Sequence, residues 1–312
     1  MKVVVTGSIA FDYLMTFPGY FREHILPDQI AKLSVSFLVD SMRKQRGGCA
    51  ANIAYNIALL GERPVLMGTA GQDFAEYRAW LEARGVDTSA AVEIADEFTS
   101  SFFVSTDRDN CQIASFYIGA MAHASKLSLR DVKPPIDLVI ISPNDPDAMR
   151  QYPRECKEMG IPYLYDPSQQ IIRLGGDDLR EGIEGSKLLV VNDYEFEMIR
   201  AKTGLSEEQV LSRTSALIVT RGGDGSTIWT GGKRVEIPVA RAQRIADPTG
   251  VGDAYRAGIV KGMSLGWPWE ATGRLGSLAA VYALEQAGTQ NHSYTWAEFA
   301  ARYRENFGEL VI

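Results

Sequence analysis

Short apolar strands alternate with helical segments along most of this chain of 312 residues, and this alternation constrains the fold more than any other feature. The segment Ile136–Ser142 is almost wholly apolar, which is typical of strands that a parallel sheet buries on both faces. Strands that alternate with helices predict an α/β fold with a doubly wound, mostly parallel sheet flanked by helices. The other strands that we expect in this sheet are Val3–Val5, Val65–Gly68, Pro162–Tyr165, Leu188–Asn192 and Ala216–Thr220. The expected helices include Gly48–Leu60, Phe74–Arg84 and Tyr194–Lys202.

Two stretches, approximately residues 13–46 and 98–118, depart from this alternation. In the first stretch, Ser34–Val39 alternates polar and apolar residues in the manner of a strand. In the second, Ser101–Ser105 and Ile113–Tyr117 flank a turn and predict a β-hairpin. We expect the two stretches to form a small β-rich lid inserted in the main domain. Long surface decoration is the alternative interpretation.

The composition excludes several classes of partner. The formal net charge is −7, whereas proteins that bind nucleic acids usually carry a basic surface, so no nucleic acid partner is expected. The three cysteines and three histidines are scattered without a Cys-x-x-Cys pair, which disfavours a zinc site and favours a reducing compartment. No apolar run reaches the roughly 20 residues that span a bilayer. We therefore expect a cytoplasmic protein with a single domain over residues 1–312 and no membrane partner.

The most informative motif is the string Asp247-Pro-Thr-Gly-Val-Gly-Asp-Ala-Tyr-Arg-Ala-Gly258. Gly250 and Gly252 stand just ahead of an apolar helical stretch, where glycines let backbone N–H groups converge on an anion at a helix N-terminus. Asp253 lies in the same turn, where a carboxylate can accept the proton of a hydroxyl group that attacks phosphorus. A capped helix with an acidic first turn is the structural alternative for a shorter version of this motif.

This string resembles the C-terminal signature of the ribokinase/PfkB family of sugar and nucleoside kinases. A second segment, Gly47-Gly48-Cys49-Ala50-Ala51-Asn52, matches the family's N-terminal signature and lies about 200 residues earlier. The likeness covers essentially the whole chain. It implies a ribokinase-like fold and an ATP-dependent kinase whose acceptor is a primary hydroxyl group.

The resemblance also assigns roles at the acceptor site. It implies that Asp253 is the catalytic base, that Gly250 to Gly252 form the anion hole, and that Asp12, Gly48 and Asn52 hold the hydroxyl groups of the substrate. Asp12 stands at the end of an apolar stretch that we expect to be a strand. In open α/β sheets, ligands bind at the carboxyl ends of the strands. A carboxylate can accept from two adjacent hydroxyls, and an amide can both donate and accept.

Two further motifs resemble the nucleotide site of the family. Asn192 and Glu195 match an Asn-x-x-Glu motif that organises Mg²⁺ and the nucleotide phosphates through water, which suits the preference of Mg²⁺ for oxygen ligands. Thr220, Gly222 and Gly225 match a glycine-rich stretch that holds the nucleotide. A helix N-cap and a glycine-rich hairpin turn are the respective structural alternatives.

Other details of the signature leave questions open. K⁺ or another monovalent cation could bind near Asp247 and Thr249, but Pro248 between them lacks an N–H group. Arg256 either touches a phosphate or crosses to solvent on the helix face. The first strand is followed by Gly7 without a Gly-x-Gly-x-x-Gly motif, which disfavours a dinucleotide-binding dehydrogenase.

The residue types around the acceptor site favour a nucleoside, with adenosine first. Cys49 is small, whereas sugar kinases of the ribokinase branch usually carry Lys or another polar residue in its place. Alternate strand residues share a face, so Val35 with Phe37, and Ser101 with Phe103, could line the pocket. The aromatic candidates in the lid are Phe17, Phe37, Phe102, Phe103, Phe116 and Tyr117.

Alternatives to this hypothesis remain open. Ribose, fructose or another sugar could be the acceptor, and a non-catalytic nucleoside or sugar sensor would be a protein of another class. The partners that we expect are thus ATP and a small molecule. The chain could act as a monomer or as a homodimer through the lid.

Overall fold

The computed structural model describes residues 1–32 and 34–309, and its central feature is a nine-stranded sheet. Neighbouring strands are parallel from β5 to β11, and the last two strands, β12 and β13, are antiparallel. The predicted doubly wound α/β fold is therefore confirmed. In sheet order the strands are β13 (Lys233–Ile237), β12 (Ser226–Thr230), β11 (Ala216–Thr220), β10 (Leu188–Asn192), β9 (Tyr163–Tyr165), β8 (Leu138–Ile141), β1 (Val3–Thr6), β4 (Val65–Gly71) and β5 (Asp87–Ile94).

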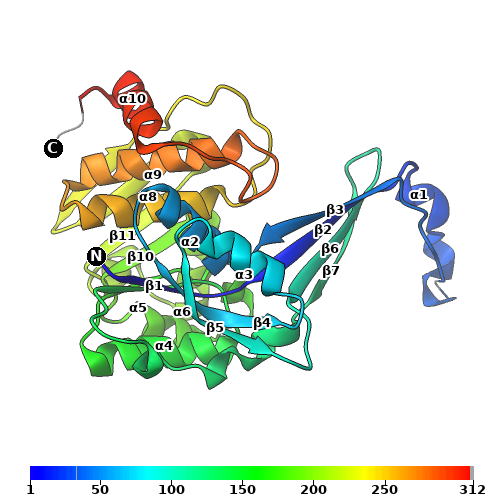
Figure 1. Cartoon of the computed structure of the whole chain (residues 1–312), viewed down its shortest axis with the longest axis horizontal. Coiled ribbons are helices and arrows are strands. Elements are labelled where there is room, and N and C mark those ends of the chain that lie inside the picture. Colours follow the sequence, from blue (N-terminus) through cyan, green and yellow to red (C-terminus); the bar gives the residue numbers. More distant parts are fainter. Residues whose placement is uncertain (33, 310–312) are drawn as a thin grey trace.

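Helices cover both faces of this sheet (Figure 1). Because successive strand residues point to opposite faces, Val3 and Val5 enter one apolar cluster while Val4 enters the other. The first face is covered by α2 (Cys49–Leu59), α3 (Ala75–Glu82), α8 (Val251–Ser264), α9 (Trp269–Leu284) and α10 (Trp296–Phe307). The second face is covered by α4 (Pro146–Met159), α5 (Gly176–Ile183), α6 (Asp193–Thr203), α7 (Glu207–Leu211) and the 3-10 helix η2 (Gly119–Lys126). The other 3-10 turns of the main body are η3 (Leu129–Asp131), η4 (Ser168–Ile172) and η5 (Gly222–Asp224).

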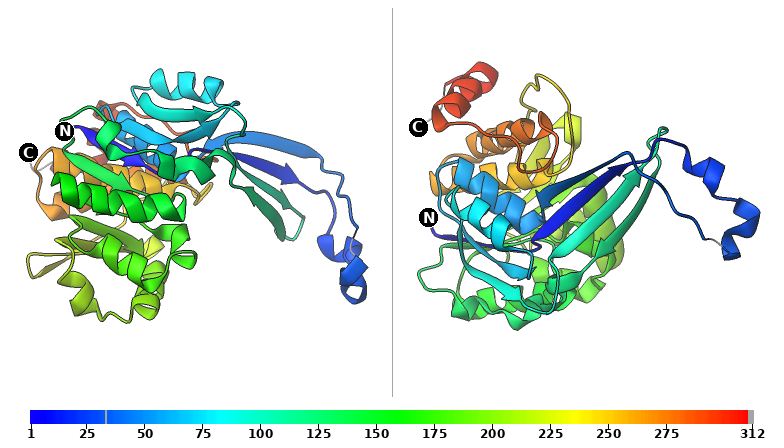
Figure 2. Two further views of the ribbon diagram at one scale, coloured as in Figure 1. Left: turned by 90° about the horizontal axis from the view of Figure 1, so that it is seen from below. Right: turned by 45° about the vertical axis from the view of Figure 1, so that its right-hand side comes forward.

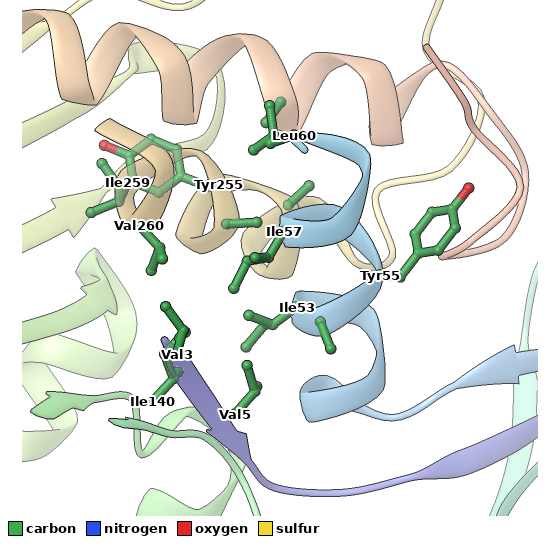
Figure 3. Close-up of a cluster of buried hydrophobic side chains, with 14 of the residues drawn as sticks. Val3, Val5, Ile53, Tyr55, Ile57, Leu60, Ile140, Tyr255, Ile259 and Val260 are labelled. Atoms are coloured by element: carbon green, nitrogen blue, oxygen red, sulfur yellow. The ribbon is translucent and has the colours of Figure 1, made fainter. Parts of the chain in front are cut away.

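The core fixes α2 and α8 against the sheet, and these two helices carry the signature motifs. Figure 3 shows Ile53 and Ile57 of α2 pointing toward Val5 of β1, with Val260 of α8 beside them. These side chains are fully buried. Helix α8 also packs closely on α9, because a side chain at Gly258 would lie 2.6 Å from the Cα atom of Gly276. The N-termini of α2 and α8 are therefore held at fixed positions along one edge of the sheet.

Four further strands form a separate sheet, which we call the lid sheet. In order they are β3 (Ser41–Gly47), β2 (Ala10–Thr16), β6 (Ser100–Thr106) and β7 (Gln112–Tyr117). Figures 1 and 2 show the lid sheet extending away from the main body, with α1 (Phe21–His24) near its far tip. The 3-10 helix η1 (Pro27–Lys32) follows α1. The predicted hairpin corresponds to β6 and β7, which pair antiparallel.

Two local predictions for the lid were wrong. Residues Ser34–Val39 form no strand; β2 pairs instead with Ser41–Gly47, the next segment of the chain. The alternation was misleading because Phe37 packs edge-on against Phe17 and Phe21 in a small aromatic cluster. Asp12 does not close the first strand, since β1 ends at Thr6 and Asp12 lies inside β2.

Candidate active site

A cavity of about 910 Å³ lies where the lid sheet meets the main body. Its volume falls in the range that holds small molecules of drug or nucleoside size. Five of the residues predicted for the acceptor and the anion lie on its wall, which are Asp12, Gly48, Asn52, Gly250 and Asp253. They come from the lid sheet, from the start of α2 and from the start of α8, so a ligand in the cavity would contact all three elements.

The start of α8 is built to receive an anion. Gly250 caps the helix with φ +78, a left-handed conformation that favours glycine. A side chain at Gly250 would also lie 3.0 Å from the side chain of Thr289. The N–H groups of the first turn have no acceptor inside the helix, and the helix dipole adds a partial positive charge there. This turn can therefore bind a phosphoryl group.

Asp253 stands in this first turn as a half-buried carboxylate at the cavity wall. The amide Nδ2 of Asn52 donates to Asp253 Oδ2 at 2.9 Å, which joins α2 to α8. Burial raises the pKa of Asp253 to about 6, while Arg256 and the hydrogen bond from Asn52 oppose the rise. The carboxylate is thus mostly ionised at neutral pH and still basic enough to accept a proton from a hydroxyl group.

Asp12 faces the same cavity from β2. Burial, and then the negative charges of Asp247 and Asp253, raise the pKa of Asp12 to about 6. Two carboxylates on the wall of one cavity can accept hydrogen bonds from several hydroxyl groups. The sugar part of a ligand is the group that offers such donors.

Gly48 lets the backbone of the second signature pass close to the chain that enters the lid. Its φ is +92, and a side chain there would lie 2.6 Å from the backbone nitrogen of Ala10 and from the carbonyl oxygen of Ser8. Ser8 Oγ in turn accepts a hydrogen bond from the N–H of Cys49 at 2.9 Å. Burial raises the pKa of the Cys49 thiol, so this position presents a neutral group to the cavity.

The residues predicted for the nucleotide lie at the carboxyl ends of the next strands and are not part of the cavity wall. Asn192 and Thr220 are paired in register at the ends of β10 and β11, and Gly222 and Gly225 form the turn after β11. Ligands gather at this edge in open α/β sheets. These residues lie outside the cavity wall. Their position suits a second ligand that would meet the ligand of the cavity at the start of α8.

Asn192 and Glu195 form the helix cap that was the structural alternative. Asn192 Oδ1 accepts from the N–H of Glu195 at 2.7 Å, and Glu195 Oε2 accepts from the N–H of Asn192 at 2.8 Å. Glu195 Oε1 also accepts from Ser168 Oγ. Among the described residues, no group of three His, Cys, Asp or Glu side chains could hold a metal ion. A Mg²⁺ ion here would therefore depend on phosphate oxygens and water, which is how Mg²⁺ usually binds with nucleotides.

The aromatic wall of the cavity differs from the prediction. Phe102 and Phe116, which are cross-strand partners, line the cavity, whereas Phe37 and Phe103 do not. Phe103 points to the opposite face of the lid sheet and stacks on Tyr13 with ring centroids 4.7 Å apart. The expected pairing of Phe103 with Ser101 thus chose the wrong face of β6.

The sequence interpretation assigned no role at the acceptor site to two glutamines. Gln290 Nε2 donates to Asn52 Oδ1 at 2.8 Å, which turns the Nδ2 group of Asn52 toward Asp253. Gln170 lines the cavity from η4, and its buried Oε1 has no hydrogen-bond partner among the described residues. No spacing rule links Gln290 to Asn52, because 238 positions separate them in the chain.

If Asp253 is the catalytic base that the sequence resemblance implies, its raised pKa predicts that catalytic efficiency falls on the acid side, with a midpoint near pH 6. Protonated Asp253 cannot accept the hydroxyl proton, and the coupled carboxyl of Asp12 titrates in the same window. The measurement is kcat/KM for the acceptor between pH 5 and pH 8.5, in buffers of constant ionic strength.

Thermal unfolding separates this effect from loss of structure. A carboxyl whose folded-state pKa is raised contributes stability that is present below its ordinary pKa near 3.8 and is lost as pH rises through about 6. These two groups therefore make the unliganded protein more stable at pH 5 than at pH 8, opposite to the change in activity. A flat profile of kcat/KM from pH 5 to pH 8 would contradict the role of the carboxylates.

The comparisons with known proteins match this chain to one family of kinases. Residues 4–296 match the family described as pfkB family carbohydrate kinase. The nucleoside kinase of Methanocaldococcus jannaschii is 31% identical over 307 residues, which cover 98% of this chain and 97% of that protein. The structural model has no helix in its described residues that is long and apolar enough to cross a membrane.

Solved structures of a nucleoside kinase are similar to this chain in fold. The Burkholderia thailandensis nucleoside kinase in complex with inosine superposes with a TM-score of 0.90 at 37% sequence identity, covering 99% of this chain and all of that one. Its complex with ADP-inosine has a TM-score of 0.87 at 40% identity, with coverage of 99% and 97%. The similarity extends over the main sheet and the lid sheet, since nearly the whole of both chains is included.

Proposed function

Because the chain belongs to the pfkB family of carbohydrate kinases, we propose that it transfers the terminal phosphoryl group of ATP to the primary hydroxyl of a nucleoside. One observation carries the proposal: the cavity that holds Asp12 and Asn52 is also lined by Asp253, in the first turn of α8. The names of the relatives support a nucleoside as acceptor, since they include nucleoside kinases and a complex with inosine.

In the proposed mechanism, Asp12, Gly48 and Asn52 hold the ribose hydroxyls and orient the primary hydroxyl toward Asp253. Asp253 accepts the proton as the hydroxyl oxygen forms a bond to the terminal phosphorus of ATP. The bond between that phosphorus and the bridging oxygen breaks, and ADP leaves with the electron pair. The N–H groups from Gly250 to Asp253 stabilise the negative charge on the transferring phosphoryl oxygens.

We propose that ATP lies along the ends of β10 and β11. Asn192, Thr220, Gly222 and Gly225 would contact its phosphates and ribose, and Glu195 with Asn192 would hold a hydrated Mg²⁺ ion. Such an ion would neutralise part of the phosphate charge. Both oxygens of Asp247 already accept backbone N–H groups, from Thr249 and Gly288. A K⁺ ion there would have to compete with these bonds, so activation by K⁺ stays a prediction for a salt-exchange assay.

We place the base of the nucleoside against the part of the cavity wall that the lid sheet and η4 provide. Phe102 and Phe116 offer apolar ring surface, and base stacking on aromatic side chains is favourable for any base. The buried Oε1 of Gln170 lacks a donor, so a base that presents an N–H group would satisfy it. Adenine presents an exocyclic amino group beside a ring nitrogen acceptor, which matches a glutamine amide. Adenosine is therefore the first acceptor to test, and other purine nucleosides follow it.

The test is ADP release from ATP with a panel of nucleosides and pentoses. We expect adenosine or another purine nucleoside to stimulate ADP release well above the rate with ATP alone, and ribose or fructose to have little effect. If a sugar stimulates release and nucleosides do not, the sugar alternative is correct. If no acceptor stimulates release but one raises the melting temperature, the protein is a sensor. The Tm shift with each compound is measured in parallel.

A further inference from the structure

Arg256 is a buried cation in the signature helix that the mechanism above does not use. It lies three residues after Asp253 in α8, so both side chains project from the same side of the helix. Only 7% of Arg256 is exposed to solvent. Charged side chains are rarely buried to this degree unless they are paired.

Its partner is Asp166, the residue that follows β9 and is 1% exposed. Arg256 Nη2 donates to Asp166 Oδ1 at 2.6 Å, and Arg256 Nε lies 2.5 Å from Asp166 Oδ2. This arrangement, one hydrogen bond from Nη2 and an ion-pair contact of Nε, holds the guanidinium group against Asp166. It also uses two of the three nitrogens and leaves Nη1 free to face another group.

The free nitrogen lies against the anion-binding turn. A Cβ atom at Gly252 would stand 2.7 Å from Arg256 Nη1, so the guanidinium group reaches the backbone of the turn that starts α8. No hydrogen bond joins Nη1 to another group within residues 1–32 and 34–309. The glycine at position 252 therefore does two things: it exposes its N–H group and it leaves room for the arginine.

Three carboxylates lie near Arg256. Burial by itself lowers the pKa of an arginine, but Asp166, Asp253 and Glu195 together raise the pKa of Arg256 above its ordinary value. One cation thus faces three carboxylates. A phosphoryl group that carries several negative charges would be repelled by this cluster unless a cation stood between them.

We propose that Arg256 is a further catalytic residue, which donates from Nη1 to an oxygen of the phosphoryl group in transit, and that Asp166 is the positioning residue that aims it. The inference rests on the proposed kinase function and deepens it. A planar guanidinium group held against a buried carboxylate by a hydrogen bond and an ion-pair contact can present its remaining N–H groups to a ligand. It would supplement the backbone N–H groups of the turn as negative charge shifts during transfer.

A purely structural ion pair is the competing explanation, and the chain offers a matched control for it. Arg302 forms a two-pronged pair with Glu285 at 2.8 and 2.6 Å, and both residues are about 10% exposed. This pair joins α10 to the end of α9, and neither residue lines the cavity. Replacing either arginine leaves a buried carboxylate without its cation, so both replacements are expected to lower Tm.

The experiment compares Arg256→Gln and Arg256→Lys with Arg302→Gln and Arg302→Lys in the ADP-release assay, with Tm measured for each variant. We expect kcat to fall about 10²–10³-fold in Arg256→Gln, the loss typical of removing one donor to a developing oxyanion. Arg256→Lys should also lose activity, because the single ammonium group of lysine cannot both pair with Asp166 and reach the phosphoryl group. The Tm shift on adding nucleoside should be unchanged. The Arg302 variants should keep the wild-type kcat while folded.

Two further measurements make the result decisive if the variants lose stability. Guanidinium chloride should partly restore kcat of Arg256→Ala, whereas sodium chloride at equal concentration should not. Asp166→Asn should lower kcat with little change in the KM for nucleoside. The proposal is overturned if folded Arg256→Gln keeps kcat within about threefold of wild type, or if the Arg302 variants lose as much. A wild-type protein that releases no ADP with any acceptor would instead refute the kinase function itself.

Discussion

Asp253→Asn is expected to lower kcat for nucleoside phosphorylation about 10³-fold while the protein stays folded. A positioned general base contributes about 10²–10⁴-fold to such reactions, and the amide cannot accept the hydroxyl proton. The side chain keeps its shape and its place beside Asn52, so binding of nucleoside and of ATP should change little. The measurement is kcat and both KM values, taken together with the Tm of each protein.

A matched control separates the loss of a base from the loss of a helix-terminal charge. Asp147 lies in the first turn of α4, as Asp253 lies in the first turn of α8, but it does not line the cavity. Asp147→Asn should lower stability slightly and leave kcat unchanged. Asp253→Asn should instead raise the Tm of the unliganded enzyme at pH 8, because the folded-state pKa of Asp253 is raised and its ionised form is disfavoured by burial. If Asp253→Asn turned over within tenfold of the wild-type rate, Asp253 would not be the base.

The second large effect is expected at Asp12. Asp12→Ala should lower kcat/KM for the nucleoside about 10²–10³-fold, because hydrogen bonds to a charged acceptor contribute about 1.5–3 kcal/mol each and the side chain could hold two ribose hydroxyls. The KM for ATP should change little. The measurement is a double-mutant cycle, in which wild-type and Asp12→Ala enzymes are compared on a ribonucleoside and on its 2′,3′-dideoxy analogue.

The double-mutant cycle tests whether Asp12 contacts the ribose hydroxyls. The penalty of Asp12→Ala should largely disappear with the dideoxy analogue, because the missing hydroxyls are the groups that Asp12 would hold. Asp40→Ala is the control, since Asp40 is exposed and lies next to β3 of the lid sheet. A loss that is equal for both substrates would show that Asp12 acts on the lid sheet and does not contact the sugar.

The architecture could be predicted from short local patterns. Apolar runs such as Leu188–Asn192 are buried strands in the structure, and the helix that begins after Gly48 ends at Leu59, one residue before the predicted end. Local patterns suffice there because burial on both faces of a parallel sheet demands an apolar side chain at nearly every position. The lid was harder, since the alternation at Ser34–Val39 reflects packing of Phe37 in a small aromatic cluster and not strand pairing.

Some residues of the site could be predicted from sequence motifs, and others could not. Asp12, Asn52 and Asp253 lie on one cavity, as the two signature motifs led us to expect, and their roles remain proposals. Gln290 and Asp166 could not be assigned in the same way. Gln290 reaches Asn52 across 238 positions of sequence, and Asp166 reaches Arg256 across 90. Such contacts depend on how separate strands and helices are packed, which no single local pattern encodes.

The central chemical event of the proposed reaction is the transfer of a proton from a primary hydroxyl to Asp253 while phosphorus bonds to that oxygen. The most direct test uses 5′-deoxyadenosine beside adenosine, with ADP release, Tm shift and the identity of the product measured for both. We predict that adenosine gives the 5′-monophosphate alone, and that 5′-deoxyadenosine raises Tm but gives no ADP above the rate with ATP alone. Phosphorylation at another hydroxyl, or ADP release that is equal with the two compounds, would contradict the account.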